Sequence, residues 1–79
     1  MARVLLFGPL RDLAGWRERQ IETGSLHELR AFLAAEDADL GAALGGKGVQ
    51  VAVDQAVVRG DAALYAASEV AFLPPMSGG

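Results

Sequence analysis

The residues best suited to chemistry are Pro74–Gly79, which follow the short apolar run Val70–Leu73. That run is expected to form a buried strand, which must end at Pro74 because proline cannot donate a ladder hydrogen bond. Residues Pro74–Gly79 can reach about 20 Å at about 3.3 Å per residue. Gly78 and Gly79 have no Cβ, so the tip of this arm is narrow enough to thread a confined passage. The reactive group would be the carboxylate of Gly79, which needs activation, for instance as an acyl-adenylate, before it can react.

The side chains suggest no competing site. The sequence contains no cysteine, so it has no disulfide, no thiolate metal site and no thiol that could carry sulfur. His27 has no second candidate ligand nearby, and no metal site is expected. Glu36, Asp37 and Asp39 are expected to solvate a loop, and Arg59-Gly60-Asp61 to form a turn. The chain is therefore predicted not to be an enzyme by itself.

Length and composition indicate one small globular domain. The chain has 79 residues, and 52% of them are hydrophobic, which is ample for a packed core. A net charge of −3 without a basic stripe argues against nucleic acid as a partner. No apolar run approaches the roughly 20 residues of a membrane span, and Met1–Leu10 lacks the features of a signal peptide. We expect a cytoplasmic protein that binds no membrane.

A sheet must position this C-terminal arm, and its first strand is expected at Arg3–Phe7. Alternation along that strand places Val4 and Leu6 on one face and Leu5 and Phe7 on the other. The other short elements follow from turn residues and periodicity. They are a helical turn at Leu10–Ala14, an edge strand at Trp16–Glu22, a turn at Asp39–Leu44, strands at Val49–Val53 and Val57–Val58 joined by a tight turn at Asp54-Gln55, and one helical turn at Ala63–Tyr65.

The main helix is expected to run from Ser25 to about Ala35. Ser25 and Glu28 have the spacing of a capping box, which satisfies backbone donors at the start of a helix. The apolar residues recur at helical spacing and predict a face that packs on the core. These residues are Leu26, Leu29, Phe32 and Leu33.

Three stretches resemble the MoaD family, the small sulfur-carrying subunits of molybdopterin synthase. Glu69–Gly79 is similar to the family's C-terminal signature, and Val4–Gly15 is similar to its first strand and the turn after it. Val53-Asp54-Gln55 stands where the family usually has Val-Asn-Gln. The resemblance implies an α+β, ubiquitin-like β-grasp fold, with a mixed sheet of about five strands and one main helix packed across one face. Residues 1–73 would form the domain and residues 74–79 a flexible tail.

The resemblance also implies a function in molybdenum cofactor biosynthesis. An E1-like enzyme would use ATP to adenylate Gly79, whose carboxylate would then become a thiocarboxylate. The tail would enter a pocket of the large catalytic subunit, within a heterotetramer, and donate sulfur to cyclic pyranopterin monophosphate. The chain itself would bind no cofactor. The residues that would thread the partner are Pro74, Pro75, Met76, Ser77 and Gly78.

A docking surface is expected beside the root of the tail. If the main helix covers the sheet face that holds Val4 and Leu6, strand parity leaves another apolar set uncovered. An exposed apolar patch beside a reactive terminus is a docking surface by default. The residues of this open-face patch are Leu5, Phe7, Val57 and Leu73.

The chain departs from the family pattern at Asp54 and at Ala67-Ser68, where a Gly-Asp turn usually precedes the last strand. The sequence therefore does not predict the geometry of the turn at Ala67-Ser68. Three alternatives also remain: a thiamine-pathway sulfur carrier of the same fold, a ubiquitin-like modifier that joins Gly79 to a lysine, and an interaction module with an inert tail. The segment Phe72–Ser77 favours the molybdopterin branch over the thiamine branch.

Overall fold

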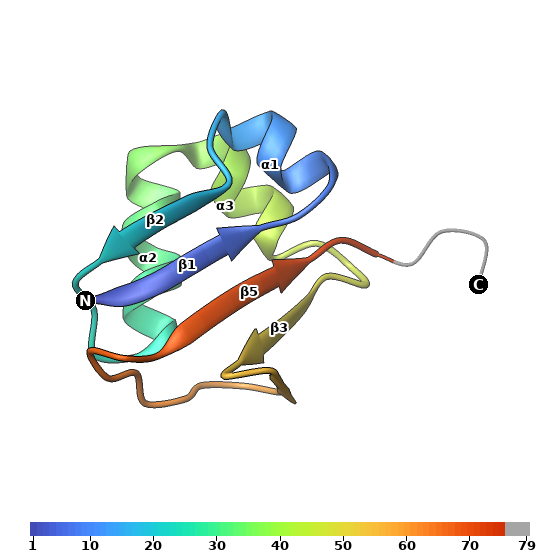
Figure 1. The fold of residues 1–79 in the computed structure, drawn as a ribbon. Coiled ribbons are helices and arrows are strands. Elements are labelled where there is room, and N and C mark those ends of the chain that lie inside the picture. Colours follow the sequence, from blue (N-terminus) through green and yellow to red (C-terminus); the bar gives the residue numbers. More distant parts are fainter. Residues whose placement is uncertain (76–79) are drawn as a thin grey trace.

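The computed structural model describes residues 1–75, in which a five-stranded sheet is covered on one face by helices (Figure 1). Met76–Gly79 lie outside the described residues. The strands are β1 (Ala2–Leu6), β2 (Glu18–Ile21), β3 (Gln50–Val53), β4 (Ala56–Val58) and β5 (Glu69–Leu73), and the helices are α1 (Pro9–Ala14), α2 (Leu26–Glu36) and α3 (Ala38–Leu44).

The sheet has the order β2-β1-β5-β3-β4, so the first and last strands are central neighbours. These two strands, β1 and β5, run parallel, and every other pair is antiparallel. This is the mixed sheet that the sequence predicted. Strand β2 lies at an edge, as its polar sequence indicated, although it covers Glu18–Ile21 rather than Trp16–Glu22.

The alternation of the two central strands separates a covered face from an open face. Val4 and Leu6 of β1, and Val70 and Phe72 of β5, are buried beneath the helices, as predicted. The neighbours between them in sequence point to the opposite, open face. The core is completed by side chains of the helices and the remaining strands, chiefly Leu10, Ile21, Leu26, Leu29, Leu33, Leu40, Leu44, Val51 and Leu64.

Helix α2 starts where the capping pattern predicted. The hydroxyl of Ser25 accepts a hydrogen bond from the Glu28 N–H at 3.1 Å. Asp61 Oδ1 accepts from the His27 N–H at 2.8 Å, and the Ala62 carbonyl accepts from the Leu26 N–H at 2.9 Å. The loop that contains Asp61 therefore satisfies two donors that a helix start leaves unpaired.

The prediction that Phe32 belongs to the buried face of α2 is wrong, since 44% of this residue is exposed. Leu26, Leu29 and Leu33 are buried on that face. Successive residues of a helix are about 100° apart, and Phe32 lies about 100° from Leu33, at the border of the buried stripe.

The turn expected at Asp39–Leu44 is longer than predicted and forms helix α3. Its cap is Asp37, whose Oδ1 accepts from the Leu40 N–H at 3.1 Å. Leu40 and Leu44 are buried, so α3 adds a second apolar stripe to the core beside α2.

The helical turn expected at Ala63–Tyr65 is absent from this part of the described chain, which is extended. The Leu64 N–H donates to the Gly24 carbonyl at 3.0 Å, so it is not available for a helical hydrogen bond. The following turn is closed by Ser68, whose N–H donates to the Tyr65 carbonyl at 3.0 Å and whose hydroxyl accepts from the Tyr65 N–H at 2.8 Å. Ala67-Ser68 thus forms an ordinary hydrogen-bonded turn before β5.

The tight turn predicted at Asp54-Gln55 joins β3 to β4. Both residues have positive φ, 49° and 71°, as in the turns that match the twist of a two-residue hairpin. Asp54 Oδ1 also accepts from the Glu69 N–H at 2.9 Å. The aspartate that departs from the family pattern therefore ties this turn to the start of β5.

We expect Phe72→Ala to lower the free energy of unfolding by about 3–5 kcal/mol, because it empties a fully buried aromatic site. Phe32→Ala makes the same truncation at a residue that is 44% exposed, and it should cost less than about 1 kcal/mol. Denaturant unfolding followed by circular dichroism measures both. Equal losses would show that Phe72 is not a core residue.

Asp61→Asn should lower the thermal midpoint at neutral pH. The backbone N–H groups of His27 and Ala62 hold the pKa of the Asp61 carboxyl below its ordinary value. A lowered folded-state pKa means that the stabilisation is fully present above about pH 4 and is lost as the pH falls through the folded-state value. The difference between the two proteins should therefore shrink in acid. Glu22→Gln removes another exposed carboxylate and should leave the thermal midpoint at neutral pH nearly unchanged; a fall equal to that of Asp61→Asn would contradict this role.

Candidate functional site

The open face of the sheet carries an apolar row that crosses several strands. Cross-strand pairing places Leu5 beside Ala71, Ala71 beside Ala52, and Ala52 beside Val57. These residues alternate with core residues along their strands, and no helix covers this face (Figure 1). Val57 is 56% exposed at the edge strand β4, and Leu5 is half-buried.

The C-terminal ends of β1 and β5 extend this row toward the tail. Because the two strands are parallel, Phe7 and Leu73 reach the same edge of the sheet. Phe7 is 45% exposed and Leu73 is half-buried. The structure therefore brings all four residues of the predicted open-face patch onto one face, with Phe7 and Leu73 at the end nearest Pro74.

The tail itself is described only at its root. Pro74 is half-buried and Pro75 is exposed, and both follow β5 directly. The other predicted tail residues, Met76, Ser77, Gly78 and Gly79, lie outside the described residues.

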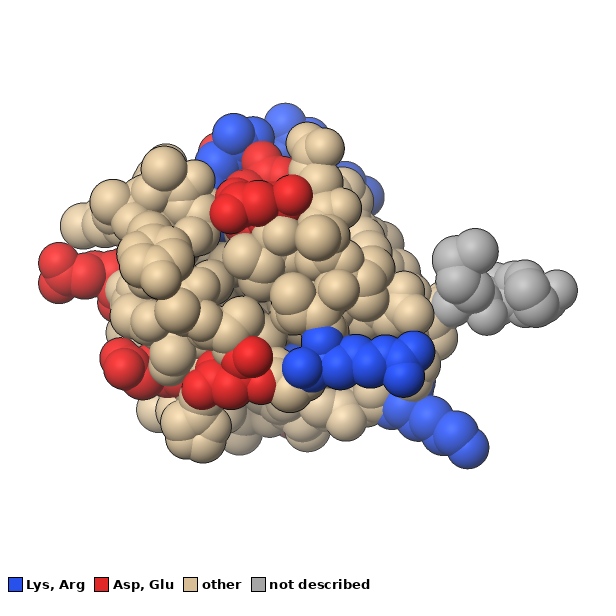
Figure 2. Space-filling model, turned by 90° about the horizontal axis from the view of Figure 1, so that it is seen from below, with Lys and Arg blue, Asp and Glu red and all other residues tan. Residues whose placement is uncertain are grey.

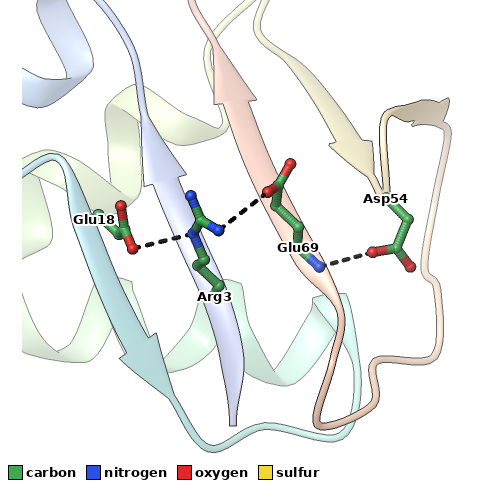
Figure 3. A network of polar contacts seen from close by, with 4 residues as sticks. All are labelled: Arg3, Glu18, Asp54 and Glu69. Atoms are coloured by element: carbon green, nitrogen blue, oxygen red, sulfur yellow. Dashed lines mark hydrogen bonds and ion pairs between the residues drawn. The ribbon is translucent and has the colours of Figure 1, made fainter.

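A charged group borders the apolar row at the opposite end of the open face (Figure 3). Arg3 Nε lies 3.1 Å from Glu18 Oε2, and Arg3 Nη1 lies 3.7 Å from Glu69 Oε2. Such exposed ion pairs contribute little to stability. These ion pairs form a polar border of the open face on the side away from the tail. Sequence reasoning missed this group, although strand parity already placed Arg3 on the same face as Leu5.

Basic side chains flank the patch. A hollow of about 280 Å³ is lined by Leu5 and Phe7 together with Arg11, Arg17 and the ion pair of Arg3 with Glu18. A second hollow, of about 360 Å³, has Val57 and Arg59 among its lining residues, together with Arg30, which extends from α2 on the covered side of the sheet and lies over the Phe72 ring. In the lower half of Figure 2, acidic side chains lie mainly on the left, and basic ones lie toward the side at which β5 ends. The tail side of the molecule therefore combines apolar surface with positive charge, despite the negative net charge of the chain.

Residues 1–75 offer no arrangement for metal chemistry, since they contain no group of three His, Asp or Glu residues that could hold an ion. His27 is exposed, and its backbone N–H donates to Asp61 Oδ1 at the start of α2. None of the helices described is long and apolar enough to cross a membrane.

Comparison with solved structures shows the fold. The small archaeal modifier protein SAMP1 from Haloferax volcanii superimposes with a TM-score of 0.84 at 22% identity, covering 99% of this chain and 98% of that one. SAMP1 from Methanosarcina acetivorans gives a TM-score of 0.86 at 21% identity, covering 99% of this chain and 95% of that one. The ubiquitin-like β-grasp prediction is thereby confirmed.

Comparison of sequences shows the family. The chain is 33% identical, over 81 aligned positions and the whole length of both proteins, to the molybdopterin synthase sulfur carrier subunit of Escherichia coli strain K12. That relative is a carrier subunit by name, which supports the prediction that this chain is a carrier rather than a catalyst. Residues 4–79 also match the model of the ThiS family. The chain belongs to the ThiS family and is a ubiquitin-like sulfur carrier of the ThiS and MoaD kind.

Proposed function

We propose that this chain is the sulfur carrier subunit of a molybdopterin synthase and that the carboxyl group of Gly79 carries the sulfur. The observation that carries the proposal is the full-length similarity to the E. coli sulfur carrier subunit. The sequence adds a constraint, because a chain without cysteine has no side-chain thiol for this task. The carboxyl group of Gly79, at the tip of the narrow tail, is the place where we expect the thioacid to form.

The chemistry takes place in two exchanges on that carboxyl group. The carboxylate attacks the α-phosphate of ATP on an E1-like activating enzyme, which forms an acyl-adenylate and releases pyrophosphate. A hydrosulfide ion supplied by a donor then attacks the acyl carbon, the bond to AMP breaks, and the thiocarboxylate and AMP are the products. The charged thiocarboxylate next enters the large catalytic subunit, where its sulfur passes to cyclic pyranopterin monophosphate.

The domain contributes recognition to this reaction. The open-face patch offers apolar area beside the tail, and Arg11 and Arg17 near Leu5 and Phe7 suit an acidic rim on a partner. Docking there holds the tail at the entrance of a partner's active site. Proximity of this kind replaces a search in solution with a reaction between bound groups.

The match to the ThiS family favours one second candidate, a sulfur carrier for thiamine synthesis. Both candidates form the same thiocarboxylate and differ in the acceptor. Incubating the thiocarboxylated chain with its large subunit and cyclic pyranopterin monophosphate separates them, because only the first candidate yields a dithiolene product. An isopeptide adduct between Gly79 and a lysine would instead identify a protein modifier.

Removal of Gly79, or addition of one alanine after it, should abolish thiocarboxylate formation. Each change moves the reacting carboxyl by about one residue, or about 3.3 Å, which exceeds the tolerance of an active site. Mass spectrometry after incubation with the activating enzyme, ATP and a sulfur donor should show replacement of oxygen by sulfur in the native chain alone. Circular dichroism should show that all three proteins are folded. A thiocarboxylate on the extended chain would contradict the proposal.

Leu73→Asp and Val57→Asp should each weaken binding to the activating enzyme and to the large subunit by about tenfold or more. Burial of one such side chain contributes about 1.5–3 kcal/mol, and an introduced charge loses its hydration without a partner. Gln20→Asp places the same charge on the open face beside Arg3 and is the matched control. Calorimetric titration measures all three. Unchanged affinity in both patch variants would exclude this surface as the docking site.

A further inference from the structure

The sheet topology places a residue on each side of the root of the tail. Strand β5 lies between β1 and β3, parallel to the first and antiparallel to the second. Continuing the β1–β5 register by two positions beyond Leu6 and Phe72 sets Gly8 opposite Pro74. Continuing the β3–β5 register by two positions beyond Gln50 and Leu73 sets Gly48 opposite Pro75.

Both flanking residues are glycines in the left-handed region, with φ of 57° for Gly8 and 87° for Gly48. A Cβ on Gly8 would lie 3.2 Å from Pro74 Cγ. A Cβ on Gly48 would lie 3.0 Å from Pro75 Cβ and 3.5 Å from Pro75 Cα. Carbon atoms in contact normally stay about 3.5–4.0 Å apart, so an alanine at either position requires the facing proline to shift by a few tenths of an ångström.

Proline makes these contacts stiff. Its ring is closed onto its own backbone nitrogen, which fixes φ near −65°. Unlike the end of a long side chain, the ring of Pro75 cannot rotate away from an obstacle at position 48. Relief requires the backbone of Pro75 to move.

We propose that Gly8 and Gly48 are positioning residues that set the direction in which the tail leaves the domain. The proposal rests on the proposed function, because direction matters only if the carboxyl of Gly79 must reach a defined point. In this view the open-face patch determines affinity for the activating enzyme. The two glycines determine how well a docked chain presents its carboxyl group.

Gly48 is the cleaner site for a test. Gly8 combines its φ of 57° with a ψ of −134° and also caps α1, so a substitution there disturbs the fold for other reasons. Gly15 and Gly60 supply matched controls, since their φ values of 83° and 79° are also left-handed but a Cβ on either would meet no atom within 4 Å. All three alanine variants introduce comparable backbone strain, and only Gly48→Ala obstructs a proline.

The experiment measures steady-state thiocarboxylate formation by the cognate activating enzyme with native chain, Gly48→Ala, Gly15→Ala and Gly60→Ala. We expect Gly48→Ala to lower kcat by about tenfold or more with KM changed less than about twofold, because a shift of Pro75 misplaces the reacting group while docking is intact. The two controls should keep the native kcat. In the native chain, nuclear Overhauser contacts should connect the Gly48 Hα protons to the Pro75 ring.

Each outcome decides something different. If the native chain reacts and Gly48→Ala is no slower than Gly60→Ala, the positioning role is wrong while the proposed function stands. Missing contacts between Gly48 and Pro75 in the native spectrum would overturn the positioning role on structural grounds alone. A rise in KM with unchanged kcat would assign Gly48 to docking and also overturn it. If the native chain is not converted at all, the proposed function fails and this inference fails with it.

Discussion

The placement of β5 between β1 and β3 is the constraint on which the rest of the structure depends. A strand in the centre of a sheet is hydrogen-bonded on both sides, and Val70 and Phe72 also fix it from the core. The backbone position from which the next residue continues is therefore firmly fixed. An edge strand such as β4 would deliver the tail from a part of the fold held on one side only. The most strongly held strand of the domain is therefore the one that leads into the proposed sulfur-carrying tail.

The two faces of this sheet have separate tasks. The covered face holds the core and provides stability, and the open face holds little that the fold requires. Its residues can therefore suit partners: apolar from Leu5 to Val57, polar around Arg3, and flanked by arginines near the tail. This separation allows a chain of 79 residues, with one core, to keep a large part of its surface for recognition.

Local signals made much of this fold predictable from the sequence. Strand parity gave the correct face for Val4, Leu5, Phe72 and Leu73, and the Ser25 cap located α2. The errors lie where long-range contacts override local preference. Ala63–Tyr65 has helical composition, but the Leu64 N–H donates to the Gly24 carbonyl and the Tyr65 N–H donates to the Ser68 hydroxyl. Phe32 sits at the border of a helical stripe, where periodicity is ambiguous.

The surroundings of the candidate site were less predictable. Arg3, Glu18 and Glu69 are far apart in sequence, and only the register of three strands brings their side chains together. The same holds for Gly48 and Pro75, because the residues around a loop glycine do not indicate which distant residue packs against it. The tail motif was recognisable because its residues are consecutive.

The parallel pairing of β1 with β5 has a consequence for biosynthesis. The pairing joins residues near the start of the sequence to Glu69–Leu73, so the sheet cannot close until that late segment has left the ribosome. Before then, β1 and β2 can form only a two-stranded hairpin, which is marginal in water. Folding is therefore dominated by contacts between distant parts of the chain and should be slow for its size. A nascent chain interrupted before Leu73 remains unfolded and open to proteolysis, so the cell accumulates docking-competent domains only from chains that already include the strand leading into the tail.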